Sequence, residues 1–115
     1  MSANRARPER RRETRCPIHV NVQVMGRAEG YALARDISAG GMRIETASLL
    51  PPAGQTCRVS FRLSPGCALL AARARVLWHK RIAPGLSQAG LGFIELPLTT
   101  QAAIARFVRA AAETV

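Results

Sequence analysis

The chain has 115 residues, of which 48% are apolar and 4% aromatic, and it carries a formal net charge of +10 at pH 7. This length fits one domain with a mainly aliphatic core and leaves no room for a second domain of ordinary size. Arginine interrupts the apolar stretches well before the length of a membrane span, so we expect none. The positive charge indicates an anionic partner.

The first 15 residues read as a basic arm. They contain six arginines against two glutamates, which gives this segment a net charge of +4. Within it, Arg11, Arg12 and Arg15 cluster guanidinium groups, whose planar forks match phosphate oxygens and the acceptor edge of guanine. A solvated basic tail is the simpler interpretation of such a run taken alone. We expect residues 1–15 to be flexible and to become ordered around an anionic ligand.

From residue 16 onward the pattern is that of short β-strands. Apolar and polar residues alternate strictly between Ile18 and Val24, which is the period of a half-buried strand. Comparable runs separated by turn residues predict five further strands. We therefore expect residues 16–115 to form one mainly β domain, a small six-stranded antiparallel barrel. The further strands are expected at about residues 31–37, 42–45, 57–63, 70–79 and 89–96.

The last two elements complete this predicted domain. In the longest strand, alternate residues from Leu70 to Trp78 share one face, so Trp78 is expected in the core. After Pro97 the apolar residues recur at helical spacing, which predicts a single amphipathic helix at about residues 98–112. We expect the apolar stripe of this helix to pack against the barrel.

A second polar motif lies between two of the predicted strands. The segment Asp36-Ile37-Ser38-Ala39-Gly40-Gly41 reads as a tight turn. The Asp and Ser side chains of such a turn bond either the nearby backbone or a ligand, and local bonding is the commoner outcome. The two glycines permit unusual dihedral angles and a close approach to a bound molecule.

Together, the two motifs and their order resemble the PilZ domain family. Its members bind the bacterial second messenger cyclic di-GMP through an RxxxR motif and a later [DN]xSxxG motif. RxxxR falls on Arg11 and Arg15, and [DN]xSxxG falls on Asp36, Ser38 and Gly41. The resemblance continues through a strand pattern ending in Gly-Leu-Gly-Phe-Ile-Glu and the final helix, and so covers nearly the whole chain.

The resemblance implies a bacterial cyclic di-GMP receptor or adaptor that changes its surface on binding, and no enzyme, catalytic residue or cofactor. It implies a regulated partner protein, in motility, biofilm or exopolysaccharide control, and leaves monomer and dimer open. Arg10 directly precedes the motif and is a candidate additional contact that would favour two intercalated ligands over one. The implied ligand-binding residues are Arg11, Arg12, Arg15, Asp36, Ser38, Gly40 and Gly41.

The cysteines give no sign of a disulfide framework or a metal site. Three cysteines without CxxC spacing, and no segment resembling a secretory signal, lead us to expect a reducing cytoplasm. Cys16 and His19 have CxxH spacing, but the sequence has no second pair to complete four zinc ligands. We therefore expect no metal.

Two alternatives to the receptor remain open. A basic small barrel with a basic arm also suits nucleic acid, although assigning most of the five aromatic residues to core faces makes this less favoured. The other alternative is a ligand-independent PilZ-like interaction module, against which the intact motifs argue. The Cys16-Pro17 pair directly after Arg15 departs from the family pattern and could direct the arm along another path.

Overall fold

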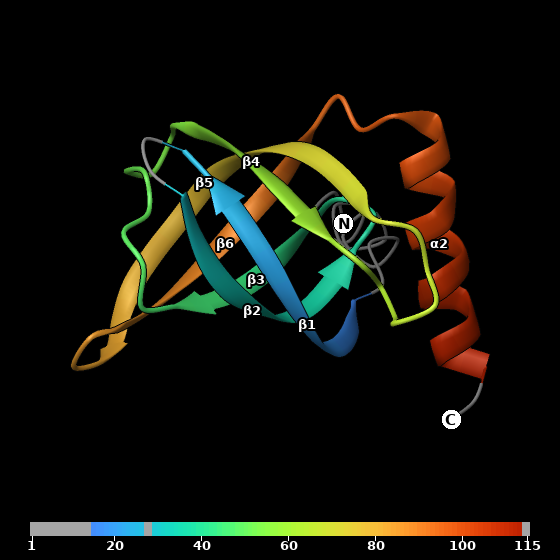
Figure 1. Cartoon of the computed structure of the whole chain (residues 1–115), viewed down its shortest axis with the longest axis horizontal. Helices are drawn as coiled ribbons and strands as arrows, with labels where there is room; N and C mark the ends of the chain where they lie inside the picture. Colours follow the sequence, from blue (N-terminus) through green and yellow to red (C-terminus); the bar gives the residue numbers. More distant parts are fainter. Residues whose placement is uncertain (1–14, 27–28, 114–115) are drawn as a thin grey trace, which may run out of the picture.

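The computed structural model describes residues 15–26 and 29–113. Six antiparallel strands close into a barrel in the order β1-β2-β3-β6-β5-β4, and helix α2 lies beside it (Figure 1). The predicted six-stranded barrel with one C-terminal helix is confirmed. The expected flexibility of the arm concerns residues 1–14, which lie outside the described residues. The elements are β1 Cys16–Met25, β2 Glu29–Ser38, β3 Gly41–Thr46, β4 Thr56–Phe61, β5 Leu70–Ala83, β6 Leu86–Ile94 and α2 Leu98–Glu113.

The barrel interior is filled by the inward residues of the alternating strands. In β1, every second residue from Cys16 to Val24 is buried, as the sequence pattern predicts. The helix contributes Ile104 and Val108 to the same core, which fits its predicted apolar stripe. Among the described residues, no helix combines the length and the apolar character that a membrane crossing requires.

In strand β2, the face that packs on the core is not the one that carries its large residue Tyr31. Ala32 and Ala34 are buried, whereas Tyr31 is 65% exposed. A β-bulge between Ala34 and Asp36 then interrupts the alternation. Small residues therefore line this part of the interior, and the bulge re-aims the end of the strand that carries the second motif.

The expected burial of Trp78 is wrong. Val76 pairs with Leu91 and is fully buried. A bulge then inserts one extra residue into β5, so that Trp78 pairs with Gly90, the residue next to Leu91 on β6. Because one inserted residue reverses the face that follows it, the Trp78 side chain lies on the outside of the barrel, 40% exposed.

Candidate functional site

The centre of the site is Asp36, near the end of β2. The barrel registers place Asp36 opposite Arg43 on β3 and opposite Pro17 on β1. Arg15 directly precedes β1, so the antiparallel pairing brings it to the same point although it lies 21 residues away in sequence. The fold itself therefore joins the end of the arginine motif to the start of the second motif.

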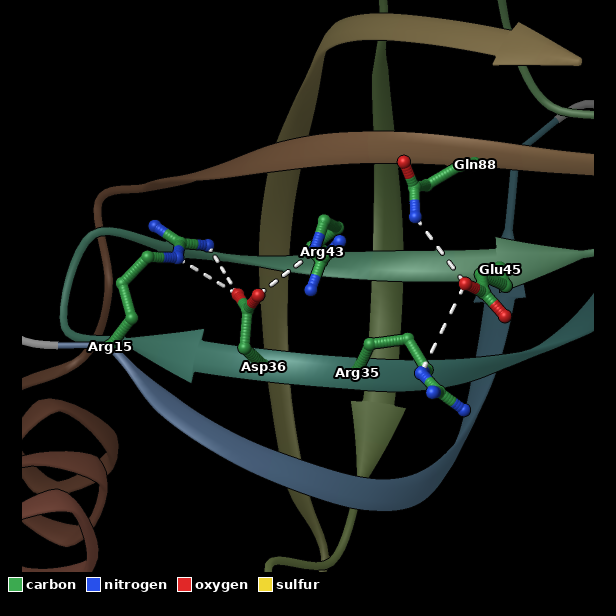
Figure 2. Close-up of polar contacts among 6 residues, drawn as sticks. All are labelled: Arg15, Arg35, Asp36, Arg43, Glu45 and Gln88. Carbon is green, nitrogen blue, oxygen red and sulfur yellow. Dashed lines mark hydrogen bonds and ion pairs between the residues drawn. The ribbon is translucent and has the colours of Figure 1, made fainter. Parts of the chain in front are cut away.

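Asp36 forms ion pairs with two arginines at once (Figure 2). Its Oδ1 accepts from Nε of Arg15 at 2.8 Å and lies 2.7 Å from Nη2, and its Oδ2 accepts from Nε of Arg43 at 2.8 Å. The Asp36 side chain is 13% exposed, whereas both arginine side chains are over 40% exposed. Two cations around one anion leave a local charge of +1, which favours an anionic ligand.

A second polar cluster lies beside this one on β2, β3 and β6. Glu45 of β3 accepts from Nε2 of Gln88 at 3.3 Å and lies 4.0 Å from Nε of Arg35 (Figure 2). The carboxylates of the two clusters are therefore both already paired with arginine. The difference between them is that Asp36 contacts Arg15, the last residue of the basic arm.

The turn after Asp36 is held by local bonds. Ser38 is fully buried, and its Oγ accepts from the backbone N–H of Gly40 at 3.2 Å. The Gly40 carbonyl in turn accepts from the N–H of Phe93 at 2.9 Å. These contacts support a role for Ser38 in shaping the turn and fixing it to β6.

Gly41 is needed for close packing and not for an unusual dihedral angle. Its φ is not left-handed, but a Cβ at this position would lie 2.0 Å from the backbone oxygen of Leu91. Strand β6 can therefore approach β3 at this point only because Gly41 has no side chain.

A pocket of about 370 Å³ is lined by the two arginines, Asp36 and the glycine turn, and also by residues of β5 and β6. It gathers four of the predicted site residues, and Ser38 does not line it because its side chain faces inward. Arg10, Arg11 and Arg12 lie outside the described residues, so their roles stay predictions. The pocket is lined by Arg15, Asp36, Gly40, Gly41, Met42, Arg43, Leu77, Trp78, Gly90 and Leu91.

Sequence reasoning missed Arg43 and Trp78 as residues of this pocket. Arg43 had a signal, because Met42 and Ile44 alternate with it, so its side chain had to leave the barrel next to the turn. Trp78 had none, since the bulge that turns it outward is not visible in the alternation of β5.

A larger pocket, of about 490 Å³, lies over β1 and β4 and contains no residue of either motif. Tyr31 and Arg62 are among its lining residues. We assign the candidate site to the smaller pocket, because that one combines two guanidinium groups, a glycine turn and an exposed aromatic ring.

Comparison with known proteins places this geometry in a family. The model of the PilZ domain matches residues 9–110. A comparison with curated protein sequences finds no match.

Several solved structures share the fold. The inhibitor of motility MotI/DgrA of Bacillus subtilis superposes with a TM-score of 0.79 at 21% identity, over 89% of this chain and 51% of that one. YcgR of Escherichia coli in complex with c-di-GMP superposes with a TM-score of 0.75 at 15% identity, over 91% of this chain and 47% of that one.

The PilZ domain of YcgR alone, also with c-di-GMP, gives a TM-score of 0.73 at 14% identity, over 91% of this chain and 93% of that one. The chain thus spans about half the length of the first two structures and nearly all of the isolated domain. With the match over most of its sequence, a closed six-stranded barrel and both motifs meeting at Asp36, the chain belongs to the PilZ domain family.

Proposed function

We propose that this protein is a receptor for cyclic di-GMP that binds the nucleotide between its arginine motif and the turn after β2. The observation that carries the proposal is the ion pair between Arg15 and Asp36, which joins the two motifs at one pocket. The similar YcgR structures contain c-di-GMP, which supports the choice of ligand. The role is one of binding, with no reaction proposed.

The covalent chain limits where the other arginines can act. Arg11 is four residues from Arg15, so its Cα lies within about 14 Å of the Arg15 Cα whatever path the arm takes. Arg11 and Arg12 are therefore within reach of a ligand seated at the pocket. We propose that they bind its phosphates or guanine edges, and that Arg10 adds a further contact.

Binding on this arm would change the surface next to β1 and β2. We propose that a partner protein recognises this change, and that the regulated process is motility, biofilm formation or exopolysaccharide production. The structural likeness to an inhibitor of motility supports motility as the first of these to test.

Isothermal titration with cyclic di-GMP tests the proposal, with GTP as the control ligand. Charge-assisted contacts contribute about 1.5–3 kcal/mol each, so Arg11→Ala or Arg15→Ala should weaken binding by roughly tenfold to a hundredfold. The double variant should lose binding. The matched control is Arg106→Ala/Arg109→Ala, which removes the same two charges from the exposed face of α2 and should bind as the wild type does.

The outcomes separate the proposal from its alternatives. Saturation at one or two ligands per protein, lost only in the motif variant, supports the receptor and supplies the stoichiometry relevant to Arg10. No binding at high micromolar ligand contradicts it. Because Tyr31 and Trp78 are exposed and could stack on bases, the protein should also be titrated with DNA. An affinity for DNA that is independent of sequence and falls steeply with salt would favour nucleic-acid binding instead.

A further inference from the structure

The last part of strand β5 has a neighbouring strand on one side only. Strand β4 pairs with β5 as far as Arg75, and the segment before β4 forms two backbone hydrogen bonds with Val76. Beyond this point, within the part of the chain that the structure describes, residues 77–83 have β6 as their only neighbouring strand. Backbone N–H and C=O groups of a strand point alternately to its two sides, so one side of this segment, here called the free edge, carries unpaired backbone groups.

The segment with the free edge also projects from the barrel. Buried and exposed residues alternate along β5 as far as Val76, whereas all of residues 77–83 are exposed. Figure 1 shows the hairpin of β5 and β6 at the lower left, where it reaches beyond the other strands. The free edge and both faces of this segment are therefore open to another chain.

The charges around the free edge have one sign. The sequence contains no Asp or Glu between Glu45 and Glu95, so strands β4, β5 and β6 have no acidic residue. Lys80 and Arg81 are consecutive in the segment and lie between the two register shifts of the hairpin. Because successive side chains of a strand point to opposite faces, each face of the segment carries a cation.

These cations determine which kind of chain can pair with the free edge. A second copy would place its own Lys80 and Arg81 beside the same residues, and like charges across a strand pair are destabilising. Charged side chains on an exposed edge discourage self-association for this reason. An acidic strand would meet the two cations with the opposite charge. The free edge therefore selects against a second copy and in favour of an acidic partner.

We propose that the free edge of residues 77–83 binds an extended acidic segment of a partner protein, which adds to the sheet as a strand beside β5. Acidic residues at two consecutive positions of that segment would face Lys80 and Arg81. Apolar residues on either side of them would lie beside Trp78 and Ile82, which are 40% and 41% exposed. This inference concerns the partner and does not depend on cyclic di-GMP binding.

An NMR titration of the isotope-labelled full chain with the synthetic peptide Thr-Val-Glu-Glu-Thr-Val-Thr tests the proposal. In an antiparallel register its two glutamates lie beside Arg81 and Lys80. We expect the amide signals of residues 77–83 to shift, and those amides that point to the free side to exchange more slowly with solvent. The same peptide with every amide N-methylated keeps its charges but cannot donate backbone hydrogen bonds, so it should not bind.

Exchange of charge between protein and peptide provides a matched comparison. Lys80→Glu/Arg81→Glu should weaken binding of the acidic peptide by roughly fivefold or more, because two attractive cross-strand pairs become repulsive. This variant should instead bind the peptide in which two lysines replace the glutamates. The control Arg106→Glu/Arg109→Glu makes the same change in net charge on the exposed face of α2 and should bind the acidic peptide as the wild type does.

The other outcomes contradict the proposal. Absence of a shift in residues 77–83 at millimolar peptide overturns it, and so does equal weakening in the two double variants. Shifts of these residues that grow with protein concentration alone would assign the free edge to a second copy. Shifts caused by duplex DNA and not by the peptide would assign it to nucleic acid. A wild type that binds the peptide but not cyclic di-GMP would overturn the receptor and leave this inference standing.

Discussion

Arg15 Nε donates to Asp36 Oδ1 at 2.8 Å, across 21 residues of sequence. This contact fixes Arg15, the last residue of the basic arm, to the second motif. Arg15 also belongs to the arginine motif that we propose to bind the nucleotide. Asp36 therefore has two opposed effects on a ligand, because its charge repels the phosphates while its bonds hold the cations that attract them.

Substitution of Asp36 decides which of these effects is larger. If the charge dominated, Asp36→Ala would bind cyclic di-GMP more tightly. We expect the opposite, a loss of about tenfold, because charge-assisted contacts with Asp36 hold both arginines at the pocket. Calorimetric titration measures the change.

Glu45→Ala is the control for this variant. It removes the same charge from the neighbouring polar cluster, where Glu45 lies 4.0 Å from Arg35 and is not part of the pocket. Its affinity should match the wild type or rise slightly. Equal losses in the two variants would mean that Asp36 has no special role in positioning the arginines.

The Gly41 position should be among the least tolerant of substitution. In Gly41→Ala the added Cβ meets the backbone oxygen of Leu91 at 2.0 Å, and backbone cannot move aside as a flexible side chain can. We expect the free energy of unfolding to fall by about 3 kcal/mol, the upper end of the usual cost of overpacking. Urea denaturation measures it.

Gly66→Ala is the matched control, because nothing lies within 4 Å of its Cβ position and its φ is not left-handed. The change there should stay within about 0.5 kcal/mol of the wild type. A Gly41→Ala protein as stable as this control would show that β3 and β6 can separate at little cost.

Alternation of apolar and polar residues was enough to predict the strands of the barrel, because a half-buried strand repeats every two residues. It failed where the backbone departs from that repeat. The bulge before Trp78 turns that side chain outward, and the bulge before Asp36 changes the direction of the end of β2. Neither departure has a glycine or proline at the inserted residue to mark it.

The site was predictable in its chemistry but not in its assembly. The two motifs could be read from the sequence, whereas the contact of Asp36 with Arg43 depends on the register of β2 against β3. The opposition of Trp78 and Gly90 likewise depends on which strands are neighbours in the barrel. Tertiary register of this kind is set by the whole core, and no local pattern carries it.

The titration of Tyr31 provides a test of the outer face of β2. Its hydroxyl donates to Oε2 of Glu29 at 2.8 Å, and this bond together with the Glu29 charge raises the pKa of Tyr31 above its ordinary value. The pKa of Tyr31 is higher in the folded protein than in the unfolded chain, where it is about 10. The bond to Glu29 therefore stabilises the folded protein fully at pH values below the unfolded pKa, and this stabilisation is lost as the pH rises through the folded pKa.

Tyr31 is the only tyrosine, so ultraviolet absorbance of tyrosinate follows it directly. Glu29→Gln removes the charge and should move the midpoint down toward the ordinary pKa. Superimposable titration curves for the two proteins would show that the bond to Glu29 does not persist in solution.

Thiol reactivity gives a direct test of the core. Cys16 and Cys57 are buried and Cys67 is exposed, and burial raises the pKa of the Cys57 thiol. Since the thiolate is the reactive form, we expect a chromogenic disulfide reagent at pH 8 to modify one thiol rapidly in the native protein and all three in denaturant.

Cys67→Ser is the control, and it should abolish the rapid phase. The slow reaction of the two buried thiols should remain, because their sulfurs react only when the barrel opens. A rapid phase of two or three thiols in the native protein would mean that the interior facing Cys16 or Cys57 is accessible, contrary to the packing described above.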